Sequence, residues 1–200
     1  MSGAEVPTHR YCVEFRKGGV ARFLSHIDLQ AAFERALRRA RLPLAYSQGF
    51  QPRPKLQFEE ALPLGWSSER ERMWVEFHTG YPDGEAAKRL RATLPEGVTL
   101  LRVYPAPAKP RPATERRFRV VGLSVEGDWG ERLAAAFPGA AEDGPAAAEL
   151  LDEQDGLVFH LRPGRKGQAP SLKKVLRHLL DGDPPVTLEV LRLDLPRSTA

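Results

Sequence analysis

The chain has 200 residues, a charged fraction of 28% and a formal net charge of +4, so it has room for one large globular domain or two small ones. No apolar run approaches the roughly 18 residues of a membrane helix, and the N-terminus lacks an apolar signal segment, so we expect a cytoplasmic protein without a membrane partner. The single cysteine, Cys12, excludes an internal disulfide and any multi-cysteine zinc or iron–sulfur site built from this chain alone. We therefore predict no metal and no bound cofactor.

Charge is distributed unevenly along the chain. Lysine and arginine outnumber acids by 10 to 5 between residues 9 and 60, and by 6 to none between residues 160 and 180. Acids outnumber them by 9 to 1 between residues 122 and 158. Separated basic and acidic regions can steer a polyanion to one face of a protein.

The first elements are a strand and a helix. Residues 9–16 alternate between apolar and polar side chains, which is typical of a half-buried strand. Ser25 is a good N-cap, Asp28 adds a negative charge in the first turn, and Pro43 ends the helix. The helix has an apolar stripe at helical spacing. The stripe consists of Leu29, Ala32, Phe33, Ala36, Leu37 and Ala40.

The rest of the first half completes a six-element pattern. The pattern predicts strands at 55–64, 73–78 and 98–104, a polar turn at 65–72, and a second helix that starts at Asp83 or Gly84. The resulting order β-α-β-β-α-β is the ferredoxin-like split βαβ arrangement. We predict a ferredoxin-like domain over residues 9–106.

A proline-rich segment separates this domain from the second half. We predict a linker at residues 107–115 and a second ferredoxin-like domain at 116–197. Its predicted strands are 117–125, 156–162 and 186–195, and its predicted helices are 129–137 and a Ser171-capped helix that ends at Leu180. The acidic residues 139–153 carry no clear pattern. The predicted fold class is α+β, with two ferredoxin-like units of which the second is irregular.

The start of the first helix is one candidate site. His26 lies in the first turn beside Ser25, and Arg22 precedes both. A helix N-terminus disfavours an imidazolium, so a neutral His26 could act as a general base or a donor. Capping or packing is the alternative role.

The loop that follows the first helix is the second candidate site. It could bind an anion through its amide, hydroxyl and cationic side chains. Its prolines would fix the positions of the cations, and its glycine would free backbone amides to face the anion. These side chains are Ser47, Gln48, Gln51, Arg53 and Lys55. The alternative is a structural proline-rich turn with solvated charges.

Two further groups of cations are candidates for phosphate contacts. Arg162, Arg165, Lys166 and Lys173 lie in a stretch without acids. The arginines on the polar face of the first helix are most simply solvated, although they could also follow a nucleic-acid backbone. These arginines are Arg35, Arg38, Arg39 and Arg41. We expect His26, Arg53, Lys55 and Arg165 to open onto one cleft.

Several runs resemble one bacterial family. They are Arg22-Phe-Leu-Ser-His-Ile-Asp-Leu, Phe33-Glu-Arg-Ala-Leu-Arg-Arg-Ala, Leu42-Pro-Leu-Ala-Tyr-Ser-Gln-Gly-Phe and Pro54-Lys-Leu. Together they resemble a radical-SAM-associated family of unknown function, whose members occur beside or fused to a radical SAM protein. The resemblance implies a radical SAM partner. The chain departs from the family pattern at Gln51-Pro-Arg, where the family more often has Asn-Pro-His.

These observations favour an accessory RNA-binding protein that acts with a radical SAM partner. With Cys12 as its only cysteine, the chain cannot hold the cluster of a radical SAM enzyme. A fainter, fold-level similarity to the RNA-processing ribonucleases of CRISPR systems leaves open a metal-independent RNA-processing enzyme using His26, or an RNA-modifying enzyme. A purely structural interaction module is the third hypothesis. Tyr11 and Phe15 fit a core face, so the aromatic signature of an RNA-recognition module is absent.

Overall fold

The computed structural model describes residues 7–82, 84–106, 115–123, 128–136, 147–153, 156–162, 171–182, 184 and 188–193. The chain divides into two compact units. The first unit comprises Met1–Leu64 and Glu69–Arg111, and the second comprises Gly65–Ser68 and Pro112–Ala200. None of the helices described is long and apolar enough to span a membrane.

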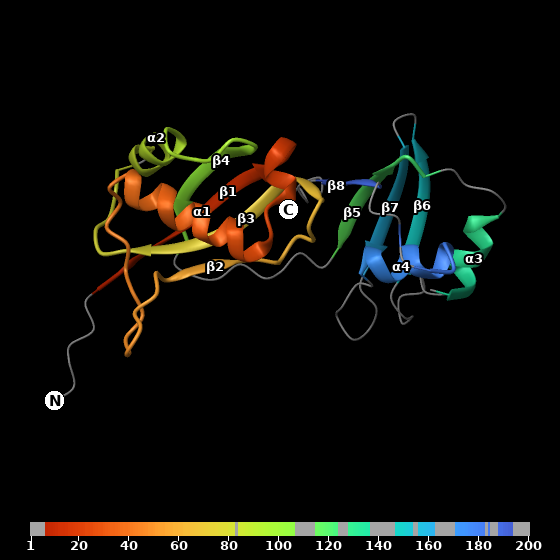
Figure 1. The fold of residues 1–200 in the computed structure, drawn as a ribbon, viewed down its shortest axis with the longest axis horizontal. Coiled ribbons are helices and arrows are strands. Elements are labelled where there is room, and N and C mark those ends of the chain that lie inside the picture. Colours follow the sequence, from red (N-terminus) through yellow and green to blue (C-terminus); the bar gives the residue numbers. More distant parts are fainter. Residues whose placement is uncertain are drawn as a thin grey trace. The chain divides into compact units, whose positions relative to one another are not determined.

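The first unit is a four-stranded sheet with helices on one face (Figure 1). Its elements are β1 His9–Lys17, the 3-10 helix η1 Gly19–Phe23, α1 His26–Arg39, β2 Leu56–Phe58, β3 Ser67–Phe77, α2 Glu85–Arg91 and β4 Val98–Pro105. The strand order is β4-β1-β3-β2, so β3 separates β1 from β2 as in the predicted split βαβ arrangement.

The core of the first unit lies between this sheet and its two helices. Val13 and Phe15 of β1 are fully buried, and the Phe15 ring lies 4.7 Å from the ring of Phe33 on α1. The predicted N-cap is confirmed, because the Ser25 hydroxyl accepts a hydrogen bond from the Asp28 backbone N–H. The apolar stripe of α1 therefore faces the sheet as its spacing predicts.

Two sequence-based assignments in the first unit are wrong. The predicted polar turn at 65–72 contains the first half of β3, and the predicted strand at 55–64 is a strand only over Leu56–Phe58. The charged residues of β3 favour a turn when they are considered alone. In the fold, Arg72 pairs with Glu59 and Arg70 pairs with Glu14 of β1. Cross-strand ion pairing thus lets a charged segment form a strand.

The second unit repeats the arrangement of the first. Its elements are β5 Arg116–Val121, α3 Trp129–Ala136, β6 Ala147–Glu153, β7 Gly156–Arg162, α4 Leu172–Leu179 and β8 Glu189–Leu193. Its strand order is β8-β5-β7-β6, and Ser67 and Ser68 at the start of β3 lie parallel to β8. The predicted fold class, α+β with two ferredoxin-like units, is therefore confirmed.

Sequence patterns locate the elements of the second unit unevenly. The strand predicted at 156–162 coincides with β7, and Ser171 caps α4 as predicted by accepting a hydrogen bond from the Lys174 backbone N–H. β6 falls in the acidic segment to which no element was assigned. Residues 107–114 of the predicted linker lie outside the described residues.

Candidate functional site

His26, at the N-terminus of α1, packs against the core of the first unit. It is partly buried, and its ring meets the Phe58 ring edge-on with centroids 5.3 Å apart. The guanidinium of Arg22 lies 4.8 Å from the centroid of the Phe23 ring. Arg22 therefore lies on η1, Ser25 is the N-cap of α1 and His26 is its first residue, with the His26 ring directed at an aromatic side chain.

A buried lysine supports this helix start, and sequence reasoning missed both this lysine and the buried Glu71 whose charge acts on it. Lys17 is 1% exposed and Glu71 is 3% exposed. The Lys17 ammonium donates a hydrogen bond of 3.0 Å to the carbonyl of Leu24, the residue before the Ser25 cap. Burial lowers the pKa of Lys17, while the charge of Glu71 acts to raise it. No sequence signal distinguishes this lysine, because it lies next to a glycine pair that indicates a turn.

The loop at 47–53 has a fixed base and an exposed tip. At the base, the Ser47 N–H donates to the Arg53 carbonyl at 2.8 Å, and the Arg53 N–H donates to the Ser47 hydroxyl at 3.0 Å. An isolated bridge between Tyr46 and Pro54 closes the loop below this point. The structure thus brings Ser47 and Arg53 together, and the predicted anion-binding loop is a narrow hairpin.

The tip of this hairpin carries a residue that sequence reasoning missed. Phe50 is fully exposed, at 107%, and Gln48, Gln51 and Arg53 of the same hairpin are exposed as well. Gly49 adopts a φ of +132°, a backbone conformation that favours glycine. An aromatic residue directly after a glycine in a polar loop is the signal that could have identified it.

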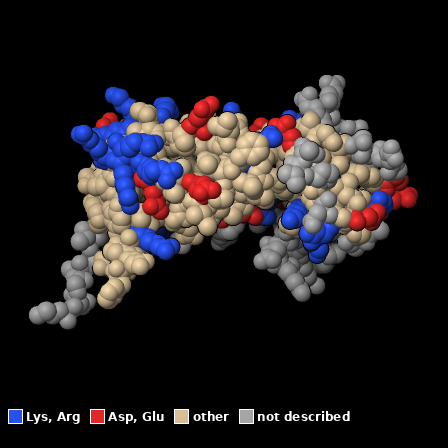
Figure 2. Space-filling model, viewed as in Figure 1, with Lys and Arg blue, Asp and Glu red and all other residues tan. Residues whose placement is uncertain are grey.

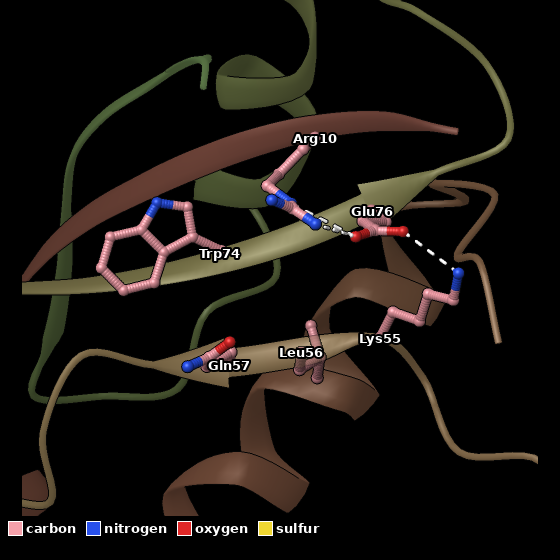
Figure 3. A pocket seen from close by; sticks show the side chains of 6 residues that line it. All are labelled: Arg10, Lys55, Leu56, Gln57, Trp74 and Glu76. Carbon is pink, nitrogen blue, oxygen red and sulfur yellow. Dashed lines mark hydrogen bonds and ion pairs between the residues drawn. The ribbon is translucent and has the colours of Figure 1, made fainter. Parts of the chain in front are cut away.

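Lys55 faces the sheet surface opposite the helices. It contacts Glu76 at 3.4 Å, and Glu76 also accepts a hydrogen bond of 2.7 Å from Arg10 (Figure 3). Burial acts to raise the pKa of Glu76, but hydrogen bonds led by that of Arg10 bring it below its usual value. With Leu56, Gln57 and Trp74, these side chains line a pocket of about 210 Å³. This volume is smaller than that of a typical small-molecule site.

The expectation of one shared cleft is wrong for His26 and Lys55. Side chains alternate between the two faces of a strand. Phe58, which contacts His26, packs against the helix-side core, whereas Lys55 is three residues away and pairs with Glu76 on the opposite face. Arg165, the fourth expected member, lies outside the described residues.

The same opposite face carries an ionic network. Glu14 is 2% exposed and accepts hydrogen bonds from Arg102 and from the Tyr104 hydroxyl, and Arg70 lies 3.2 Å away. Burial by itself acts to raise the pKa of Glu14, but the hydrogen bond from Arg102 and the charge of Arg70 lower it overall. Burial raises the pKa of the Cys12 thiol. The network ties β4 and β3 to β1.

A cluster of exposed cations covers the C-terminal half of α1 and the adjoining α2, as Figure 2 shows. We call this cluster the α1–α2 basic patch. Its members are Arg35, Arg38, Arg39, Arg41, Lys88, Arg89 and Arg91. Arg39 donates to the Thr93 carbonyl at 2.6 Å, and the Thr93 hydroxyl donates to the Ala36 carbonyl at 2.9 Å. These contacts join the ends of the two helices, so cations far apart in sequence share one surface.

Most of the charge in this patch is uncompensated. Arg38 lies 3.9 Å from Glu34, and Arg89 lies 2.7 Å from Glu85. Within the residues that the structure describes, four other patch side chains make no hydrogen bond or ion pair. These four are Arg35, Arg41, Lys88 and Arg91. Such a surface can contact the phosphates of a polyanion.

The candidates in the second half are only partly placed. Arg162 is the partly buried last residue of β7, and Lys173 is exposed on α4. Arg165 and Lys166 lie outside the described residues. Among the described side chains, no group of three or more His, Cys, Asp or Glu residues is arranged to hold a metal ion.

Two solved structures resemble the chain over most of its length. One is an unknown protein from Galdieria sulphuraria, which is 15% identical, covers 95% of this chain and 100% of its own, and has a TM-score of 0.31. The other is the acetolactate synthase small subunit from Thermotoga maritima, at 14% identity, 94% coverage of both chains and a TM-score of 0.26. Such weak likenesses carry no argument about function.

The family comparison is more specific. No curated protein matches the chain. Residues 10–134 match the family described as "Uncharacterized protein conserved in bacteria (DUF2344)". The expectation of a bacterial family of unknown function is thereby confirmed. Because the match spans more than half of the chain, the protein belongs to this bacterial family, DUF2344.

Proposed function

We propose that this protein is a cytoplasmic, RNA-binding accessory protein that acts with a radical SAM partner. The observation that carries the RNA part of the proposal is the α1–α2 basic patch. Of its seven cations, Arg38 pairs with Glu34 and Arg89 pairs with Glu85, each within its own helix. Arginine predominates among them, and its planar, permanently charged guanidinium suits phosphate oxygens.

The arrangement of the patch favours a polyanion over a solvated helix face. A solvated face needs only the exposed side of one helix, whereas this patch combines two helices held together through Thr93. The four patch cations that have no partner among the described residues would release counterions when they contact phosphates. Contacts with four phosphates of a single strand give a slope of about −3 in log K against log salt concentration.

Salt-dependent RNA binding tests this proposal. The affinity for total cellular RNA is measured over a range of salt concentrations for the wild type and for Arg35→Gln, Arg41→Gln and Arg91→Gln. Each substitution should flatten the slope by about 0.7, and the triple variant by about 2. Arg16→Gln is the matched control, because Arg16 is exposed on β1 outside the patch. It should leave the slope unchanged.

The possible outcomes separate the hypotheses. Absence of salt-sensitive RNA binding by the wild type would overturn the RNA proposal and favour a structural interaction module. Equal flattening by Arg16→Gln and the patch variants would show that net charge, and not this patch, governs binding. Cleavage of RNA by the wild type but not by His26→Ala would establish the RNA-processing alternative.

The radical SAM partner rests on the resemblance of residues 10–65 to a radical-SAM-associated family. Co-purification tests it directly. The tagged chain should retain a radical SAM protein of the same bacterium, both with and without nuclease treatment. Loss of the partner on nuclease treatment would mean that RNA alone joins the two proteins. Failure to retain any radical SAM protein would remove this part of the proposal.

A further inference from the structure

We infer that Phe50 is a base-stacking finger through which the protein holds an unstacked nucleobase of single-stranded RNA. This inference rests on the proposed RNA binding and adds to it a class of substrate. Phe50 is fully exposed at the tip of the 47–53 hairpin, which stands away from the body of the first unit (Figure 1). A fully exposed aromatic ring has both faces open to a ligand.

The hairpin that carries Phe50 is ordered by contacts in which Phe50 takes no part. Reciprocal contacts between Ser47 and Arg53 fix the base, and the Lys55 N–H donates to the Ala45 carbonyl at 2.8 Å. Lys55 is itself fixed by Glu76. Phe50 contributes to none of these contacts, so ordering of the loop precedes ligand binding. A preorganised loop loses little conformational entropy when it binds.

The neighbours of Phe50 identify a nucleobase as its occupant. A binding site for a protein would place several apolar side chains next to one another, so that together they exclude water from the interface. The tip instead carries one ring flanked in sequence by the exposed Gln48 and Gln51, and the exposed Arg53 lies at the base of the same hairpin. Amides can hydrogen-bond the edge of a base, and a guanidinium can contact phosphate or stack. Stacking on an aromatic ring tolerates every base, because each base has a π face.

Other rings of the first unit are less suited to this role. RNA-recognition modules present aromatics on the sheet, but here Tyr11 and Phe15 are buried under the helices at 6% and 0% exposure. Phe23 is 61% exposed, but one face of its ring is covered by the Arg22 guanidinium. Phe50 is thus the described aromatic residue with the largest open ring surface.

The test compares variants of Phe50 on a defined probe. The probe is a single-stranded oligouridine about 20 nucleotides long that contains 2-aminopurine, whose fluorescence reports stacking. Phe50→Ala should lower affinity about 5- to 100-fold and reduce the fluorescence change on binding. Phe50→Trp should retain both. Phe50→Leu should behave as Phe50→Ala, because leucine is apolar but cannot stack.

Phe23→Ala is the matched control, since it removes another exposed phenylalanine of the same unit. It should bind the probe as the wild type does. The salt slope of Phe50→Ala should equal that of the wild type, because the substitution removes no phosphate contact. A duplex of the same length should bind independently of Phe50, because its bases are already stacked.

The outcomes distinguish this inference from the proposed function. Wild-type binding that Phe50→Ala and Phe50→Leu leave intact would overturn the stacking finger while RNA binding stands. Full activity of Phe50→Leu alone would assign an apolar docking role to the tip and reject stacking. No binding of the probe or of cellular RNA by the wild type would overturn both proposals.

Discussion

The two units share one strand order but differ in what they bury. The first unit encloses three charged side chains, Glu14, Lys17 and Glu71, each at most 3% exposed. Among the described residues of the second unit, the buried side chains are apolar except for Ser68. One topology is therefore stabilised in one case partly by buried charges and in the other mainly by apolar packing.

The buried charges of the first unit mark the parts of its structure that specific polar contacts hold in position. Removing a charge from water is costly unless it is paired, and a buried ion pair contributes less stability than an apolar core of equal volume. In the first unit, Lys17 holds the carbonyl that precedes the α1 cap, and Glu14 joins three strands. The buried charges thus fix the start of α1 and the open face of the sheet, the surroundings of the predicted site.

The largest expected effect comes from removing the buried Lys17 ammonium. Lys17→Met should destabilise the first unit by about 3 kcal/mol, because it removes the buried ammonium that donates to the Leu24 carbonyl and whose charge interacts with that of buried Glu71. Denaturant unfolding followed by circular dichroism measures this loss. The double variant Lys17→Met with Glu71→Leu should be more stable than Lys17→Met alone. Arg16→Met, on the same strand but exposed, should change stability by less than about 0.5 kcal/mol.

An outcome in which the two changes at Lys17 and Glu71 simply add would contradict the coupling between them. In that case, the charges of Lys17 and Glu71 would not stabilise each other in the first unit.

Acid should weaken the first unit before the second. The pKa of Glu14 in the folded state lies below its ordinary value of 4.5, because Arg102 and Arg70 outweigh the effect of burial. A lowered folded-state pKa stabilises the fold above the unfolded-state pKa, and this contribution is lost as pH falls through the folded-state pKa. The free energy of unfolding is measured from about pH 7 down to about pH 3. It should decrease once the pH is lowered past about 4.5.

Glu14→Gln tests the cause of this acid sensitivity. The variant should be less stable than the wild type at neutral pH by about 1 to 2 kcal/mol, and its stability should change less with acid. Glu115→Gln, which removes the partner of His160 in the second unit, is the comparison, because Glu115 is 46% exposed there. Steeper acid sensitivity in Glu14→Gln would contradict the assignment.

The helix caps offer a smaller, matched contrast. Ser25→Ala removes the cap of a helix of 14 residues and should cost about 1 kcal/mol. Ser171→Ala removes a longer hydrogen bond, 3.3 Å, from a helix of 8 residues and should cost about 0.5 kcal/mol. Thermal unfolding measures both, and Ser→Thr at each position should restore most of the loss. The reverse ranking would show that the cap of the second unit is the stronger one.

The smallest expected effect concerns RNA binding by the second unit. Replacing Lys173 and Lys174 of α4 with Gln should lower RNA affinity less than replacing Arg41 and Arg91 does, because among the described residues α4 adds only Arg177 as a further exposed cation, whereas the α1–α2 basic patch has seven cations. The salt slope should flatten by less than about 0.7. A larger change would extend the RNA surface to the second unit, as the acid-free stretch from Arg162 to Lys173 predicts.

Local patterns in the sequence were enough for the elements with a clear period. The spacing of Leu29, Phe33 and Leu37 after Ser25 predicts α1 with its cap, and alternation predicts β1 and β7. These signals are local, because a helix or strand places its apolar residues on one face at a fixed interval. The ferredoxin-like order of the first half followed from such elements taken in sequence, whereas in the second half the pattern left β6 unassigned.

Tertiary structure alone decided the rest. The strand character of residues 67–72 depends on Glu14 and Glu59, which are distant in sequence. The face to which Lys55 points, the burial of Lys17 and the union of two helices in the α1–α2 basic patch likewise depend on non-local contacts. A charge is stable in a strand, a core or a cluster according to what the fold brings beside it, and no local pattern contains that information.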